Sequence, residues 1–321
     1  MICWRTNLLE LPNLKIFGIL LIIPILAAIV CNFCVFIVIV RMQKRAISNY
    51  LLMSLSISDL LVGIILGPLT LAQVFDINLL SNCTAHFIRS YFLVLLGGSS
   101  LLTLAVIAYD RYLLMTKLTN YNKYMTKRWG FTLVGFSWIF PGTIPIAKIL
   151  NMNAYVVLRI LNFTLSVVAL GTFYFLIIKA LNNKRVEFRQ NNQIYQSVSC
   201  YSQVDKNINK QNKLIKSSVN YFLIKNLKRQ KYYTKVAKSV TLLFTCYFAF
   251  IFPLNIWLIL EISNVKYDVI AHRIFYLCAI FLMQANSCIN PLIYYLKQKD
   301  IKNGLRQVYK SVILKKSISS I

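Results

Sequence analysis

The sequence of 321 residues is short of negative charge: nine Asp and Glu residues stand against 36 Lys and Arg residues. Charged residues of both signs make up only 14% of the chain, whereas about a quarter is usual in soluble domains. Hydrophobic residues reach 58%, and the mean hydropathy is +0.61. This shortage of charge excludes an ordinary soluble domain and indicates a membrane protein.

Groups that carry acid–base or metal chemistry are equally scarce. The two histidines, His86 and His272, both lie outside the long apolar runs. The sequence contains no HExxH pattern, no glycine-rich phosphate loop and no cysteine cluster at metal-binding spacing. We therefore predict that the protein is not an enzyme, has no metal centre and needs no cofactor, a sodium ion discussed below excepted.

Seven long apolar runs dominate the chain. They cover residues 16–40, 50–74, 90–109, 129–147, 160–178, 239–260 and 274–296. An apolar run of about 18 residues or more predicts a helix that spans a membrane. The first run is longer than the apolar core of a cleaved signal peptide, so we expect it to be retained. The predicted fold class is an all-α membrane protein with a seven-transmembrane helix bundle.

The net charge of +27 could suggest a nucleic-acid partner, but its distribution indicates a membrane topology instead. With the N-terminus outside, 29 of the 36 basic residues fall in the inner segments and seven in the outer ones. Basic residues gather on the cytoplasmic side of membrane proteins. We expect an extracellular N-terminus, a cytoplasmic C-terminus, location in the plasma membrane and no nucleic-acid partner.

The segments outside the runs complete the predicted organisation. Residues 1–13 form an extracellular N-terminus, 14–296 the seven-helix domain, and 297–321 an amphipathic helix and cytoplasmic tail. Within the domain, residues 181–233 are rich in Asn, Gln, Lys and Ser, which predicts a disordered basic loop able to contact anionic lipid and cytosolic partners. Ile301, Leu305 and Val308 recur at helical spacing among basic residues, which predicts a short interfacial eighth helix.

Two acids stand where hydrocarbon is expected. Asp59 is the only charged residue inside any of the seven runs, and Asp110 directly precedes Arg111 at the end of the third. An ionisable residue within a membrane span is costly, so it is by default a functional-site hypothesis.

These acids belong to a set of motifs, each in its own run. The set comprises Asn32, Leu55-Ser-Ile-Ser-Asp59-Leu, Asp110-Arg111-Tyr112, Trp138 and Asn290-Pro291-Leu-Ile-Tyr294. Over roughly residues 14–312 it resembles the rhodopsin-type (class A) G-protein-coupled receptors. The resemblance implies a receptor that senses an extracellular ligand and activates a heterotrimeric G protein. The activation and coupling residues that it implies are Asp110, Arg111, Tyr112, Tyr174, Pro253, Asn290, Pro291 and Tyr294.

The alternative is a small multi-pass transporter or channel. Transporters tend to show internal repeats, and none is evident in this sequence. A transporter would also usually need more intramembrane charge than Asp59 supplies. Both considerations favour the receptor.

The chain departs from the family's usual pattern at several positions. Phe250 and Ile251 replace the usual Cys and Trp before Pro253, and Tyr233 replaces the usual distal acid partner of Arg111. The fifth run has no proline, and the short outer segment 150–155 has no cysteine. In these features the chain is most similar to the melanocortin, cannabinoid and lysophospholipid receptors. The missing acid partner predicts measurable basal activity.

The resemblance also implies a ligand pocket. Its lining would be Leu93, Val94, Gly97, Ile251, Leu254, Asn255, Ile280 and Gln284. Leu93 stands where amine receptors place an aspartate, and no lysine lies in 274–296 to bind retinal. An apolar lining with two amides suits a lipid, a peptide or a nucleoside-like molecule, and not a biogenic amine or retinal. An orphan receptor with little ligand dependence is the alternative.

Receptors of this family often hold sodium at the positions of Asp59, Ser100, Asn286, Ser287 and Asn290. The side chains offer oxygen atoms, as a hard cation requires. The alternative is a hydrogen-bond network around a protonated Asp59.

The outer segments suggest two modifications. Asn82-Cys83-Thr84 is an acceptor pattern for N-glycosylation at Asn82. Cys3 and Cys83 are the only cysteines that can lie outside, so a bridge between them and two free thiols both stay open.

Overall fold

A computed structural model describes residues 14–43, 46–76, 82–117, 120–204, 209–262, 268–297, 301–308 and 310. Within these ranges the chain is helical and has no strand. The named elements are α1 Leu14–Arg41, α2 Ile47–Leu61, η2 Val62–Leu66, α3 Gly67–Phe75, α5 Cys83–Thr116, α6 Tyr121–Tyr124, α7 Lys127–Leu150, α8 Met152–Val204, α9 Asn209–Phe250, α10 Phe252–Ile262 and α11 Val269–Lys297.

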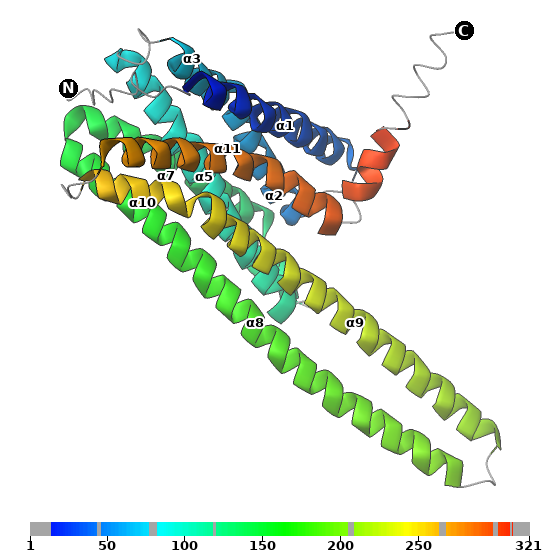
Figure 1. Cartoon of the computed structure of the whole chain (residues 1–321). Coiled ribbons are helices and arrows are strands. Elements are labelled where there is room, and N and C mark those ends of the chain that lie inside the picture. The colour runs from blue at the N-terminus through cyan, green and yellow to red at the C-terminus, as the bar shows by residue number, and fades with distance from the viewer. Residues whose placement is uncertain are drawn as a thin grey trace, which may run out of the picture.

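Seven of the described segments are long and apolar enough to cross a membrane, and they coincide with the seven predicted runs. They are Lys15–Arg41, Ile47–Phe75, Cys83–Thr116, Lys127–Leu150, Met152–Ile194, Gln230–Leu260 and Ile274–Ile293. Figure 1 shows them side by side as one bundle. We name its two ends after residues of α5: the Arg89 end, where α5 begins, and the Arg111 end, where α5 finishes. The predicted all-α bundle is confirmed.

Two spans are interrupted at proline. The second changes from α-helix to the π-helical turn η2 just before Pro68, which stands near the start of α3. The sixth breaks at Ile251, between α9 and α10, two residues before Pro253. A proline has no N–H to donate and its ring clashes with the carbonyl four residues earlier, so a helix bends or rewinds there. The break near Pro253 agrees with the sequence prediction.

The predicted disorder of residues 181–233 is wrong for the described part of that segment. Helix α8 continues to Val204, and α9 begins at Asn209. The two helices run beside each other beyond the rest of the bundle (Figure 1), and the rings of Phe188 and Tyr233 stack between them with centroids 6.1 Å apart. Residues 181–233 contain neither Gly nor Pro, so nothing in the segment breaks a helix that has already started in the membrane.

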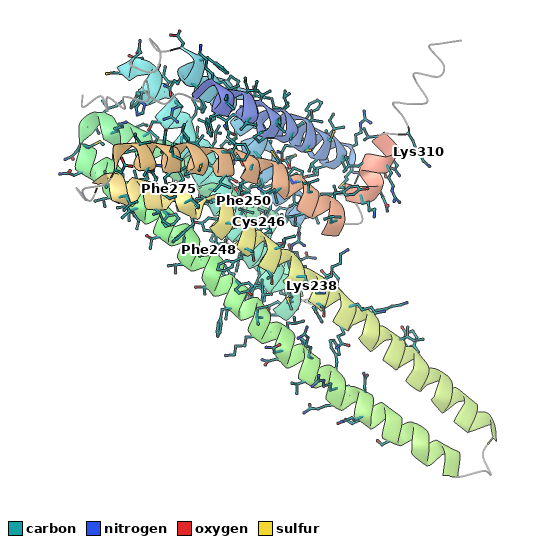
Figure 2. All side chains as sticks on the ribbon, in the orientation of Figure 1. Lys238, Cys246, Phe248, Phe250, Phe275 and Lys310 are labelled. Atoms are coloured by element: carbon teal, nitrogen blue, oxygen red, sulfur yellow. The ribbon has the colours of Figure 1, made fainter. Side chains whose placement is uncertain are left out.

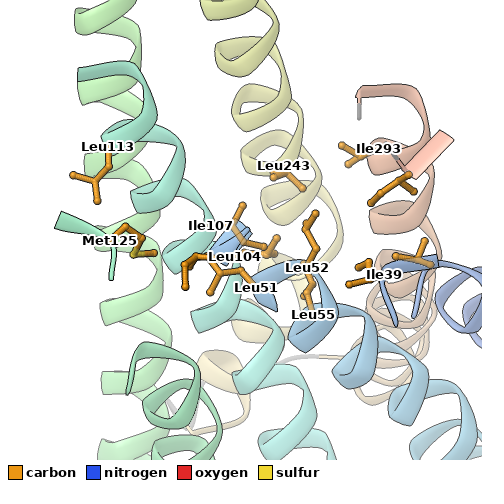
Figure 3. Packing of buried hydrophobic residues seen from close by; sticks show 13 residues of the cluster. Ile39, Leu51, Leu52, Leu55, Leu104, Ile107, Leu113, Met125, Leu243 and Ile293 are labelled. Atoms are coloured by element: carbon orange, nitrogen blue, oxygen red, sulfur yellow. The ribbon is translucent and has the colours of Figure 1, made fainter. Parts of the chain in front are cut away.

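The apolar core near the Arg111 end joins most of the bundle. Figure 3 shows Leu51, Leu52 and Leu55 of α2 packed against side chains from α5 and α9. Leu52 and Leu55 are fully buried. Along α9 the side chains change from charged, as at Lys238, to aromatic, as at Phe248 and Phe250, where the helix enters the bundle (Figure 2). Packing therefore fixes the helices at this end.

The eighth helix is present over residues 301–308. Ile301 is fully buried in the core cluster, and Leu305 packs against it from one turn further. Gly304 lies against Val38 of α1 so closely that it leaves no room for a side chain. The helical spacing predicted from the sequence is thus confirmed for these residues, whereas Tyr309 and residues 311–321 lie outside the described part.

The start of α5 contains the residues of both predicted outer modifications, Asn82 and Cys83. Asn82 is the N-cap, and its side chain accepts hydrogen bonds from the backbone N–H of Thr84 and Ala85 at 2.9 and 3.2 Å. Capping is a structural role for an asparagine that the sequence singled out only for glycosylation. Cys83 is disulfide-bonded, so the alternative of two free thiols is wrong. Its proposed partner Cys3 lies outside the described residues.

Two adjacent glycines of α5 make a test of the packing. A methyl group on Gly98 would stand 2.7 Å from Cβ of Pro141 in α7 and 2.9 Å from the amide nitrogen of Asn162 in α8, whereas one on Gly97 would meet nothing within 4 Å. We expect Gly98→Ala to lower the free energy of unfolding by about 1–3 kcal/mol through overpacking. Gly97→Ala should be neutral or stabilising, because alanine favours helix over glycine. Denaturant titration of both variants in bicelles measures the difference, and equal effects would contradict the close contact.

Candidate functional site

A polar cluster lies in the middle of the apolar bundle. Asp59 of α2, 1% exposed, accepts hydrogen bonds from three side chains on two other helices. Ser100 of α5 and Ser287 of α11 donate to one carboxylate oxygen at 3.3 and 3.0 Å, and Asn290 of α11 donates to the other at 2.8 Å. The sequence had grouped these four residues, and the structure brings them together.

Further amides surround the cluster. Asn32 of α1 is fully buried, and its Nδ2 donates to the carbonyls of Ala28 and Ser287 at 2.9 Å. Its Oδ1 accepts no hydrogen bond from any described group. Asn286, the fifth predicted member of the cluster, is also buried at 3% exposure. The region thus holds one carboxylate, two hydroxyls and spare amide oxygen, which is a donor set that fits a hard cation.

A second acid is buried at the Arg111 end. Asp110 is fully buried, and its Oδ2 lies 3.7 Å from Nε of Arg111. Ser48 at the start of α2 donates to Oδ2 at 2.8 Å, and Tyr121 of α6 donates to Oδ1 at 2.5 Å. The sequence analysis did not identify either hydroxyl as a partner of Asp110.

Tyr121 keeps its proton because of its surroundings. Burial raises the pKa of its phenol, and the neighbouring Asp110 carboxylate raises it further. A neutral phenol donates to the carboxylate, whereas a phenolate would repel it. The short helix α6 therefore acts as a cover that solvates Asp110 in place of water.

Two other predicted activation residues, Tyr112 and Tyr174, belong to an aromatic layer formed by α5, α8 and α9. Tyr112 and Phe173 lie 6.1 Å apart between ring centroids, and Tyr174 of α8 stacks on Phe244 of α9 at 4.8 Å. Tyr233, where the family usually has an acid, is 5% exposed and packs on Phe188. Pro291 lies inside α11. The side chain of Tyr294 is not among those described.

A cavity of about 60 Å³ lies nearer the Arg89 end. Its lining is Leu93, Val94, Gly97, Gly98, Leu101, Arg159, Asn162, Phe163, Ile251, Leu254, Asn255 and Met283. Six of the eight residues predicted to line the pocket are among these: Leu93, Val94, Gly97, Ile251, Leu254 and Asn255. The cavity offers room for a few water molecules.

The other two predicted lining residues lie elsewhere. Ile280 is 3% exposed and packs in an apolar cluster, and Gln284 is fully buried with no described partner for either side-chain amide atom. The sequence missed the contribution of α8, which adds Arg159, Asn162 and Phe163 to the lining. The predicted fifth span began at residue 160, so Arg159 had been counted as an outer-loop charge; the helix in fact begins at Met152.

Ile251 connects the cavity to the Arg111 end. It lines the cavity and stands at the break between α9 and α10. Its carbonyl oxygen accepts a hydrogen bond from Nδ2 of Asn255 at 3.0 Å. It also belongs to an apolar cluster that continues through Tyr247 and Val240 to Tyr233. Ile251 thus lies at the end of a helix whose apolar packing continues from the cavity to Tyr233.

Seven spans, a buried polar cluster and a cavity in the bundle define a multi-pass membrane protein. Residues 31–157 and 142–294 match the model of the family described as 7 transmembrane receptor (rhodopsin family). The chain belongs to this family of rhodopsin-type receptors, which are not enzymes. The narrower likeness to the melanocortin, cannabinoid and lysophospholipid receptors stays a prediction.

Individual relatives are receptors with different names. The chain is 24% identical to adenosine receptor A3 of Canis lupus familiaris over 311 residues, which cover 92% of this chain and 91% of that receptor. It is 28% identical to octopamine receptor beta-2R of Chilo suppressalis over 130 residues, 40% of this chain and 33% of that one. With olfactory receptor 10A3 of Homo sapiens the identity is 27% over 128 residues, 40% of each. The octopamine receptor match thus spans only about a third of that relative's length.

The cover over Asp110 leads to a stability prediction. Tyr121→Phe removes one donor from a fully buried carboxylate, and we expect a loss of about 1–3 kcal/mol in the free energy of unfolding. Tyr124→Phe, on the same short helix but with an exposed side chain, is the matched control and should have little effect. Denaturant titration compares the two, and equal losses would show that Tyr121 gives Asp110 no particular support.

Proposed function

We propose that the protein senses an extracellular ligand in the cavity and activates a heterotrimeric G protein at the Arg111 end. The N-terminus is then extracellular and the C-terminus cytoplasmic, in the plasma membrane. The uneven distribution of Lys and Arg supports this orientation. The observation that carries the proposal is the position of Ile251, which lines the cavity at the helix break and packs toward Tyr233.

The proposed mechanism is a shift between two arrangements of the sixth span. A ligand that fits the cavity better in one arrangement biases the equilibrium by its difference in affinity. Pro253 and the break at Ile251 make the junction between α9 and α10 the natural pivot. Asn255 donates a hydrogen bond to the Ile251 carbonyl at this break. Movement of α9 would open the aromatic layer and expose Arg111, whose ion pair with Asp110 is long at 3.7 Å.

The cavity lining supports a proposal for the ligand class. Leu93 supplies no counter-ion for an ammonium group, and none of the lining residues is acidic. Apolar side chains and the amides of Asn162 and Asn255 suit a lipid, a peptide side chain or a nucleoside-like molecule rather than a biogenic amine. The absence of lysine from 274–296 argues against retinal.

Signalling is tested at Arg111. Because Tyr233 replaces the usual acid, Arg111 lacks a second ion pair that would stabilise the resting state. We therefore expect the purified wild type to accelerate nucleotide exchange on at least one of a panel of G proteins without added ligand. Arg111→Ala should abolish that acceleration while the protein still reaches the cell surface. A tag placed at residue 2 and stained on intact cells measures surface level and orientation together. Unchanged exchange in Arg111→Ala would contradict the coupling role.

We further propose that a sodium ion binds at Asp59 in the inactive arrangement. Asp59, Ser100 and Ser287 would supply oxygen ligands, and Asn290 and Asn286 would complete the surroundings. The unpartnered Oδ1 of Asn32 nearby supports a bound ion or ordered water. The three hydrogen bonds already made to Asp59 support the alternative, a structural network around a protonated acid.

Sodium dependence separates these alternatives. At constant ionic strength, replacing potassium with sodium should lower basal nucleotide exchange in the wild type, because an ion stabilises the arrangement that binds it better. Asp59→Asn removes the charge that attracts the cation and should abolish the dependence. Equal sodium sensitivity in both proteins, or none in either, would leave only the structural network.

A further inference from the structure

The cavity has a positively charged wall. Arg159 of α8 lines it, and its Nη1 donates to the phenol oxygen of Tyr155 at 3.0 Å. Asn162, one turn further along α8, is 5% exposed, and its Oδ1 accepts no hydrogen bond from any described group. The lining therefore has one full positive charge, polar amides and no negative charge.

Two further cations, Lys148 and Arg89, lie toward the same end of the bundle as Arg159. Lys148 at the end of α7 lies over the ring of Tyr155, 5.5 Å from its centroid. Arg89 of α5 is 6% exposed and donates from Nη2 to the hydroxyl of Tyr276 at 2.5 Å, while its Nε has no described partner. It precedes the lining residue Leu93 by one helical turn. Arg89 and Arg159 are both close enough to Lys148 for their charges to repel its ammonium group.

These three cations lack a counter-ion among the described residues. The ion pairs of the described part are Arg111 with Asp110 and Lys184 with Glu187, both elsewhere in the chain. Arg89 is buried, and Arg159 and Lys148 are half-buried. Positive charges brought together with reduced access to water repel one another and lose part of their solvation. An arrangement of this kind is stabilised when an anion enters it.

We propose that the ligand is an organic anion whose carboxylate or phosphate is bound by Arg159. Lys148 and Arg89 add attraction from the side of the Arg89 end, and the apolar part of the ligand lies against Leu93, Leu254 and their neighbours. Guanidinium groups bind carboxylate and phosphate through paired N–H donors, which makes Arg159 the specific contact. The inference rests on the proposed role of the cavity as the ligand site.

The size of the cavity limits the ligand. About 60 Å³ holds a short apolar chain or the end of a longer one, with the charged group toward Arg159. A small soluble acid and a membrane amphiphile share this chemistry. The two sources differ in the length of the apolar part, so they can be tested with matched probes of different chain length.

The experiment uses the full chain in phosphatidylcholine nanodiscs and follows its melting temperature against probe concentration. Octanoate and octyl phosphate are compared with octanol and octylamine as soluble probes, and oleate with oleyl alcohol as the lipid probes. We expect a saturable rise with an anion of at least one set and none with its neutral or cationic counterpart. The proposal would be overturned if octanol or octylamine raised the melting temperature as much as the anions do. It would also be overturned if no anion of either set raised it.

Variants locate the binding site. Arg159→Gln should lower the affinity for the anion about tenfold or more, because a charged hydrogen-bond donor is lost. Arg159→Lys keeps the charge and should retain part of the affinity. Arg128→Gln makes the same change on an exposed arginine at the opposite end and should leave anion binding intact. Undiminished stabilisation in Arg159→Gln would contradict the site.

Nucleotide exchange separates this inference from the proposed signalling role. If an anion binds through Arg159 but changes exchange on no G protein, the anion site stands and the receptor mechanism fails. If a neutral or cationic ligand drives exchange and Arg159→Gln responds as the wild type does, signalling stands and the anion site fails.

Discussion

Burial of Asp59 in hydrocarbon is the constraint on which the arrangement of the bundle depends. A carboxylate without partners in such surroundings costs several kcal/mol, so donors must converge on it. They come from two other helices: Ser100 on α5, and Ser287 and Asn290 on α11. Asn32 ties α1 to the same place through the carbonyl of Ser287. One acid thus links four helices and, together with the apolar packing around it, helps to set their relative heights.

Charged side chains have different kinds of partner at the two ends of the bundle. At the Arg111 end, Asp110 is satisfied by hydroxyl groups of Ser48 and Tyr121, so Arg111 is bound only through a long ion pair. Near the Arg89 end, cations gather with phenols as partners and with no described carboxylate. Both arrangements agree with the proposed function, in which a protein partner binds at the Arg111 end and an anionic ligand binds near the Arg89 end.

The sequence predicted the features that depend on long apolar runs and on the rare charged residues within them. Seven apolar runs gave the spans, and a single intramembrane acid left few candidates for the partners of Asp59. It could not predict Ser48 and Tyr121, because their contact with Asp110 depends on how the connecting segments fold back. Composition also suggested disorder in 181–233, but helices that begin in the membrane continue where neither Gly nor Pro stops them. Local chemistry was predictable, whereas helix ends and connections were not.

Helix α5 joins the cavity to the polar cluster directly. Gly97, Gly98 and Leu101 line the cavity, and Ser100, between them in sequence, donates to Asp59. That bond is the longest of the three made to the carboxylate, at 3.3 Å against 3.0 and 2.8 Å from α11. A small shift of α5 caused by a ligand would break this bond before those from α11, because weak, long hydrogen bonds yield first. Loss of the Ser100 donor would change what Asp59 can bind, so under the proposed mechanism a ligand in the cavity would affect the polar cluster through α5.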